Sequence, residues 1–272
     1  MYENSDTPDR PLPRIPFAGL PETDPQALVR QLRQALGTSP GAVVISDTPT
    51  GSNTTLLELA GCLGPVVTAG TTIGGNPLEP GGVYRVKPVN DGQGVEDENG
   101  LLIFSTTSQV FEGHTDGYHN PDPPPLVMLL CVRPDRGTYG RTLITDGAAV
   151  AGSLPTDVQA LLRDPVFPTV FGHVPVLTAH PDRALPTVRF NMRELTRFRS
   201  AGHQVPADHW AAAEALHHLL CAPAHQWAEV LQAGDLLLLD NTRAVHAREA
   251  LSPNSSRLLK RVWIGRTEGH QP

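Results

Sequence analysis

Long apolar runs are missing from this sequence. The longest, Leu126–Val132 and Leu236–Leu239, are far too short to cross a bilayer. Runs of lysine and arginine are missing as well, and 21 basic against 28 acidic residues give a net charge of −7. A basic patch is the electrostatic footprint of a nucleic-acid-binding protein. We therefore expect neither a membrane nor a nucleic acid among the partners of this chain.

Cysteine is scarce, with only Cys62, Cys131 and Cys221 in the chain. Their spacing matches neither a disulfide framework nor a metal site, and the N-terminus is acidic and polar, unlike a secretory leader. This composition favours a reducing compartment and predicts a cytoplasmic protein. Cys131 lies in an apolar segment, so we expect a packed thiol there rather than a nucleophile.

Uninterrupted helical patterns are rare, because 25 glycines and 27 prolines are spread along the chain. Proline removes a donor from the helical ladder, which excludes a coiled coil or an all-helical bundle. Neither a repeat nor a linker divides the sequence, so we expect one domain over residues 1–272. Within it, residues 1–25 predict an irregular surface arm and residues 69–100 an active-site loop.

What remains is a series of short β-type segments with a few amphipathic helices. This pattern predicts a mainly β fold, a sandwich or barrel with peripheral helices. The expected helices cover residues 25–36, 54–63, 153–162 and 206–220. The expected strands cover residues 42–46, 83–89, 101–105, 126–132, 141–146, 166–177, 187–191, 235–240 and 258–265.

The segment around His114 carries the first chemical signal. His114 and Asp116 are two residues apart, so on an extended strand both side chains leave from the same face. An imidazole and a carboxylate side by side can supply two ligands to one metal ion. Two histidines and one carboxylate, with open positions left over, form the facial triad of non-haem Fe(II) oxygenases. The third ligand must come from a distant part of the chain.

A second segment, residues 234–248, offers a candidate for that ligand. It places His246 after a buried strand and a tight turn. Arg257 follows eleven residues later and Arg261 four residues beyond it, inside the next expected strand. An arginine on a strand near a metal suits a carboxylate, which it binds through a charge-assisted fork. A dicarboxylic 2-oxo acid could therefore bind the metal at one end and this arginine at the other.

The chain resembles the TauD/TfdA group of Fe(II)- and 2-oxoglutarate-dependent dioxygenases, including the clavaminate synthase-like branch. The shared features are His-Thr-Asp at 114–116, Gly-Arg-Thr-Leu at 140–143, Gly-Asp-Leu-Leu-Leu-Leu-Asp-Asn at 234–241, His246, Arg257 and Arg261. The resemblance implies a double-stranded β-helix, or jelly roll. It implies His114, Asp116 and His246 as iron ligands, and Arg257 with Thr142 as partners of 2-oxoglutarate. Arg261 would lie near the substrate or the cosubstrate.

The activity implied is oxidation of an unactivated C–H bond with Fe(II), 2-oxoglutarate and O2, which releases succinate and CO2. Related halogenases lack the carboxylate ligand, so Asp116 favours hydroxylation or another oxidation. The expected substrate is a small metabolite, first of all an amino acid or its derivative, with sulfonates and aryloxy acids left open. Residues 189–193 resemble a pocket-lining segment, and either Arg193 or Arg261 would then meet an anionic group of the substrate.

Other interpretations of the same residues stay open at this point. A zinc hydrolase could use the same three ligands, although Arg257 would then have no purpose. A catalytically silent jelly-roll binding protein is a third hypothesis. We expect His119 to be a loop histidine at the rim of the site and His217 with His218 to form a surface pair. Arg248 points either into the pocket or to solvent.

Overall fold

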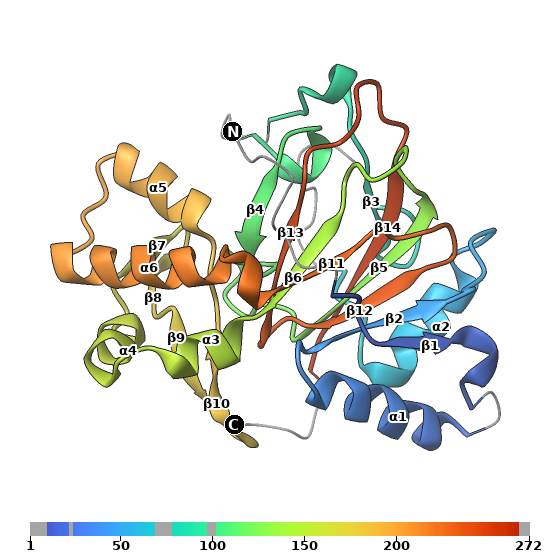
Figure 1. Ribbon diagram of the computed structural model, residues 1–272, viewed down its shortest axis with the longest axis horizontal. Coiled ribbons are helices and arrows are strands. Elements are labelled where there is room, and N and C mark those ends of the chain that lie inside the picture. Colours follow the sequence, from blue (N-terminus) through green and yellow to red (C-terminus); the bar gives the residue numbers. More distant parts are fainter. Residues whose placement is uncertain (1–9, 22–23, 69–77, 97–101, 267–272) are drawn as a thin grey trace.

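Two β-sheets form the main body of the molecule (Figure 1). The computed structural model describes residues 10–21, 24–68, 78–96 and 102–266. The larger sheet has the strand order β1-β2-β12-β5-β14-β3 and the smaller sheet the order β11-β6-β13-β4. The strands of the larger sheet are β1 (Arg14–Pro16), β2 (Ala42–Ser46), β12 (Leu236–Asp240), β5 (Leu126–Arg133), β14 (Leu258–Ile264) and β3 (Tyr84–Val86). The strands of the smaller sheet are β11 (Gln226–Glu229), β6 (Thr142–Asp146), β13 (Ala244–Arg248) and β4 (Phe111–His114).

The larger sheet is buried on both faces, which explains the unbroken apolar runs of its strands. In β12, Leu236 and Leu238 pack against the helices α1 (Pro25–Gly37) and α2 (Thr54–Leu63). The alternate residues Leu237 and Leu239 face the opposite way, into a cluster that also contains residues of the smaller sheet. The two sheets therefore share one core, and the helices close the outer face of the larger sheet.

A second group of elements lies on the other side of the smaller sheet, on the left in Figure 1. It has its own hydrophobic cluster, centred on buried residues such as Phe167, Leu177 and Leu216. Its elements are α3 (Gly147–Ser153), α4 (Thr156–Arg163), β7 (Phe167–Thr169), β8 (Gly172–Val174), β9 (Leu177–His180), β10 (Arg183–Val188), α5 (Met192–Ser200) and α6 (Ala207–Leu220). This group covers the β4 end of the smaller sheet, because α5 packs on β4.

Most expected elements are present, with bounds shifted by a few residues. The expected helix over 153–162 is present as α4, which begins at Thr156 because Pro155 is its N-cap, whereas α3 before it was not predicted. The expected strand over 166–177 is wrong, because a turn at Val170 and Phe171 folds it into the hairpin β7–β8. The strand expected over 187–191 ends at Val188, and Asn191 caps α5, a helix that we did not predict.

Three expectations for the N-terminal half also need correction. The arm over 1–25 is not wholly irregular, because β1 pairs in parallel with β2. The strand expected over 101–105 is a 3₁₀ helix at Phe104–Thr106, with Leu101 outside the described residues. Of the loop expected over 69–100, residues 69–77 and 97–100 lie outside the described residues, and β3 is shorter than the predicted strand. None of the helices within the described ranges is long and apolar enough to cross a membrane.

Candidate active site

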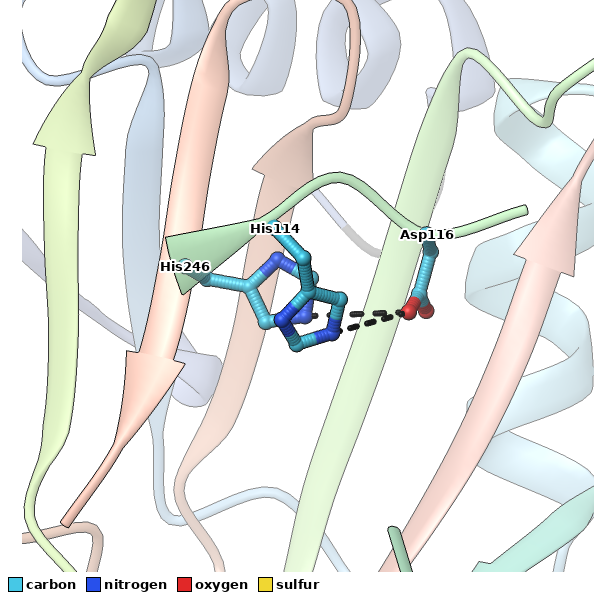
Figure 2. Close-up of side chains that lie close together, drawn as sticks. All are labelled: His114, Asp116 and His246. Carbon is cyan, nitrogen blue, oxygen red and sulfur yellow. Dashed lines mark ion pairs between the residues drawn. The ribbon is translucent and has the colours of Figure 1, made fainter. Parts of the chain in front are cut away.

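His114, Asp116 and His246 converge although they come from distant parts of the chain. Strands β4 and β13 are antiparallel neighbours, and His114 and His246 are direct partners in their register. Asp116 lies in the turn that follows β4. One ligand atom from each of the three residues lies within 4.8 Å of the other two. Figure 2 shows the two imidazole rings side by side, with the carboxylate directed at both.

The hydrogen bonds of His114 leave its Nε2 atom available as a ligand. Its Nδ1 atom lies 2.8 Å from the backbone carbonyl of Glu112, which can only accept, so Nδ1 carries the proton. The Phe111 ring stacks on the imidazole at a centroid distance of 3.8 Å and restricts its rotation. The free lone pair of Nε2 therefore points toward Asp116 Oδ1, 3.6 Å away.

His246 is held in its neutral form. Burial, followed by the neighbouring His114, lowers the pKa of His246 to about 3, although Asp116 acts in the opposite direction. Its Nε2 atom lies 3.7 Å from Asp116 Oδ1. Its Nδ1 atom is buried and has no hydrogen-bond partner among the residues that the structure describes. A neutral imidazole is the form that binds a metal ion.

Asp116 is a buried carboxylate that stays ionised. Burial alone raises its pKa, but the Arg261 guanidinium and the two histidines lower it more, so the pKa lies well below its ordinary value. The Asn241 side chain fixes the backbone of Asp116: its Oδ1 accepts from the amide at 2.8 Å, and its Nδ2 donates to the carbonyl at 2.9 Å. The Trp263 indole N–H donates to Oδ2 of the carboxylate at 2.7 Å.

This donor set fits a first-row divalent metal ion. Two imidazole nitrogens and one carboxylate oxygen that lie close together match the ligands of a non-haem Fe(II) centre. Arg261 already opposes the buried charge of Asp116, and a divalent cation among the three groups would stabilise that charge further. The three ligands that we expected from sequence are thus close together, with two from paired strands and one from the adjoining turn.

A cavity is lined by His114, Asp116 and His246. Its wall includes Thr142, which is buried on β6, and Arg257, which is 5% exposed just before β14. The Arg257 guanidinium makes no hydrogen bond to any residue within the described ranges. Burial lowers the pKa of Arg257 below its ordinary value, and Cys131 and Asp135 partly oppose this effect. A buried guanidinium that faces a cavity in this way is suited to bind a carboxylate.

Arg261 and Arg248 also line the cavity. The Arg261 guanidinium contacts the Tyr84 and Trp263 rings, with centroid distances of 4.8 and 4.6 Å, and also contacts Asp116. Arg248 is 6% exposed, which resolves the two alternatives for it in favour of the pocket. Its NH2 group donates to the carbonyls of Thr107 and Gln109. Burial, followed by the charge of Arg257, lowers the pKa of Arg248 to about 9.

The remaining expected residues lie around the site. His119 contacts Glu194 at 2.8 Å and is part of the support of α5. His217 is half-buried beside Cys221, so it is not the surface residue that we expected, whereas His218 is exposed. Cys131 is a packed thiol, and burial raises its pKa to about 12. All three cysteines are free.

The segment 189–193 packs against β4 and the loop that follows it. Arg189 binds the carbonyls of Tyr118 and Asn120, and the Asn191 backbone pairs with His114. The Arg193 guanidinium lies 3.7 Å above the Phe104 ring and near Glu112. None of the described residues that line the cavity around the triad comes from this segment.

Two residues at this site were not singled out from the sequence. Asn241 had only its place in the Asp-Asn pair at the end of β12 as a signal. Trp263 had none, because a tryptophan in an apolar strand is typical of a core.

Comparisons with known proteins agree with this arrangement. The model of the family described as "Taurine catabolism dioxygenase TauD, TfdA family" matches residues 8–263. The mitochondrial trimethyllysine dioxygenase of Bos taurus is 25% identical over 162 residues, which cover 54% of this chain and 38% of that protein. The chain thus spans well under half the length of the curated relatives that it matches.

Solved structures show the same fold. Asparagine oxygenase in complex with Fe(II), 2S,3S-3-hydroxyasparagine and succinate is similar with a TM-score of 0.62 and 22% identity, over 88% of this chain and 79% of that one. A taurine dioxygenase from Burkholderia xenovorans is similar with a TM-score of 0.63 and 19% identity, over 94% and 90% of the two chains.

Proposed function

The chain belongs to the TauD/TfdA family, a family of Fe(II)- and 2-oxoglutarate-dependent oxygenases, and from this we propose its site and substrate class. His114, Asp116 and His246 hold the iron. The substrate is an amino acid or an amino-acid derivative, which is hydroxylated at an unactivated C–H bond. One observation supports this assignment most directly. Ligand atoms of His114, Asp116 and His246 lie within 4.8 Å of one another, and the buried Arg257 lines the same cavity.

The side chains of this site have distinct tasks in the proposed reaction. When bound, iron supplies O2 activation coupled to oxidative decarboxylation of the 2-oxo acid. Arg257 and Thr142 bind the distal carboxylate of 2-oxoglutarate, which fixes its orientation in the cavity. Apolar neighbours such as Phe111, Leu129 and Leu259 line the same cavity and limit the access of water.

The substrate class rests on charge and on two relatives. Arg248, Arg257 and Arg261 give the cavity three guanidinium groups against one described carboxylate, Asp116, which favours anionic ligands. Asparagine oxygenase and trimethyllysine dioxygenase act on amino acids, as their names state. The similarity to a taurine dioxygenase supports the alternative substrate class, a small sulfonate.

We also propose that residues 1–272 form one domain with the double-stranded β-helix of this family. The two sheets share a core, and the ligands lie where β4 and β13 pair. The free cysteines agree with a reducing compartment, and the cytoplasm remains our proposal.

The test is a two-step assay. Anaerobic Fe(II) with 2-oxoglutarate should give a weak visible charge-transfer band, and a panel of amino acids and sulfonates should then be screened for substrate-stimulated succinate release. His246→Ala and Asp116→Ala should abolish both signals, whereas the exposed His218→Ala should preserve them. Wild-type protein that binds metal without the band would refute the site. If only sulfonates stimulate succinate release, the substrate is a sulfonate and not an amino acid.

A further inference from the structure

The two oxygens of Asp116 have different surroundings. Oδ1 lies 3.6 Å from His114 Nε2 and 3.7 Å from His246 Nε2. Oδ2 accepts a hydrogen bond of 2.7 Å from the Trp263 indole N–H. Arg261 NH1 lies between them, 3.3 Å from Oδ1 and 3.2 Å from Oδ2. The carboxylate is therefore oriented, with one oxygen toward the histidines and the other toward the indole.

Trp263 is well placed to maintain this orientation. It lies on β14 opposite Val127 of β5, in the middle of the shared core, and is 8% exposed. An indole has one N–H donor and no acceptor, and a buried donor without a partner is costly. If Asp116 rotated to bring both oxygens to a metal, Oδ2 would leave the indole and this N–H would lose its partner. The hydrogen bond therefore opposes that rotation.

Arg261 contacts both the indole and the carboxylate. Its guanidinium carbon lies 4.6 Å from the Trp263 ring centroid and 4.8 Å from the Tyr84 ring centroid. A cation over an aromatic ring is a favourable contact. Arg261 and Trp263 thus hold the Asp116 carboxylate with one charge-assisted contact and one hydrogen bond.

We propose that Trp263 is a positioning residue that reserves Oδ2 of Asp116, so that Asp116 offers the metal a single oxygen. This inference rests on the proposed metal site. A carboxylate that binds through both oxygens would occupy an additional coordination position. A facial triad needs three open positions, two for the 2-oxo acid and one for O2. By keeping Oδ2 away from the metal, the indole N–H leaves all three coordination positions available to the 2-oxo acid and O2.

The test compares Trp263→Phe with Trp227→Phe. Trp227 is a matched control, because it is 7% exposed in the same core cluster and contacts Arg10 rather than Asp116. Apo proteins are titrated anaerobically with Co(II), whose visible absorption reports both affinity and coordination number. In Trp263→Phe both oxygens of Asp116 can reach the metal, so bound Co(II) should have a higher coordination number and a weaker visible absorption, with a Kd changed by about 10-fold to 100-fold. Trp227→Phe should match wild type in both.

The outcomes separate the two proposals. A folded Trp263→Phe protein with wild-type affinity and spectrum would overturn the role of Trp263 and leave the metal site intact. Failure of wild-type protein to bind Co(II) would overturn the metal site, and the inference with it.

A measurement on wild-type protein covers the case in which Trp263→Phe does not fold. The chain has three tryptophans, so 15N-labelled protein gives three indole N–H signals. Trp227→Phe and Trp210→Phe identify two of them, and the third belongs to Trp263. With Zn(II) bound, the Trp263 signal should remain protected from solvent exchange. Loss of protection on Zn(II) binding would contradict a hydrogen bond that is kept in the metal-bound state.

Discussion

Arg257 combines deep burial with a guanidinium that none of the described residues binds through a hydrogen bond. A charge-assisted hydrogen bond contributes about 1.5–3 kcal/mol, which corresponds to roughly 10-fold to 100-fold in affinity. We therefore expect Arg257→Met to raise the KM for 2-oxoglutarate by roughly that factor, with a smaller change in kcat. Steady-state kinetics at varied 2-oxoglutarate concentration measure both parameters.

The control for this variant is Arg133→Met, which removes an exposed arginine of β5 that donates to the Ser256 carbonyl. It should leave the KM unchanged. An unchanged KM in Arg257→Met would move the cosubstrate contact to Arg261.

Sequence spacing was sufficient to predict that His114, Asp116 and His246 come together, but it did not predict their neighbours. These three could be selected because candidate metal ligands belong to a few residue types, at a spacing that a strand or turn brings together. Arg248 was ambiguous, because an arginine near a strand end can face either way. Trp263 could not be predicted at all, since its indole N–H matters only once β14 is known to lie beside Asp116.

The turn between β12 and β13 joins the two sheets and supports the end of β4. Asn241 in this turn is 3% exposed; its Nδ2 group donates to the carbonyls of Asp116 and Pro124, and its Oδ1 accepts from the Asp116 amide. Asn241→Asp keeps the shape but cannot donate. Two carbonyls would then face a carboxylate, at a cost of about 1–3 kcal/mol for each unsatisfied group.

We expect Asn241→Asp to lower the free energy of unfolding by about 2–6 kcal/mol and to weaken Co(II) binding, because the backbone of Asp116 loses its support. Urea unfolding and the cobalt titration measure the two effects. Asn254→Asp, in a surface turn, serves as the matched control. Wild-type values for Asn241→Asp in both measurements would show that the turn does not position Asp116.

The regular elements of the sheets were the easiest to predict. β2, β5, β12 and β14 are buried on both faces, and such strands appear in a sequence as apolar runs. Helix α5 was missed although its signals are local, since Asn191 caps it and Met192, Leu195 and Phe198 recur at helical spacing. The short hairpin β7–β8 was missed because its form depends on packing around Phe167 rather than on local pattern. Tertiary contacts decide such segments, and a single sequence does not contain those contacts in readable form.

A buried ion pair connects distant parts of the whole molecule. Arg243, at the start of β13, donates to both carboxylate oxygens of Asp146 at 3.0 and 2.6 Å and to the Gly37 carbonyl at the end of α1. Asp146 in turn caps α3 through the Ala149 amide. Removing one partner of a buried pair costs about 3–5 kcal/mol, because the other charge stays buried. Arg243→Met should therefore lose about that much stability at pH 7.

This loss should depend on pH. Burial raises the pKa of Asp146, but hydrogen bonds and charge from Arg243 lower it more, so the folded pKa lies below its ordinary value. The contribution of the pair is complete above an unfolded pKa of about 3.9 and is lost as pH falls through the folded pKa. The stability difference between wild type and Arg243→Met should shrink below pH 4. Exposed Arg163→Met is the control, and a constant difference from pH 7 to pH 3 would contradict the assignment.

Metal binding should stabilise the molecule as a whole. At a metal concentration of 100 times Kd, a site present only in the folded state contributes about 2.7 kcal/mol. For a chain of this size the corresponding rise in Tm is roughly 5–10 °C. Mn(II) should produce this rise in a thermal melt, and excess EDTA should reverse it. An equal rise in His246→Ala would place the metal elsewhere.

Strand β14 makes several functions depend on its length. Arg257, Leu259 and Arg261 line the cavity and Trp263 faces the shared core, whereas Val262 and Ile264 pack against the helices. One residue inserted between Arg257 and Leu259 would put Arg257 out of register with Arg261 and Trp263, because alternate side chains of a strand face opposite ways. Arg257 on one side of the insertion, or Arg261 and Trp263 on the other, would then turn away from the cavity and from Asp116. The spacing between these three residues therefore allows no change in length, whereas an extra residue in a loop leaves their register intact.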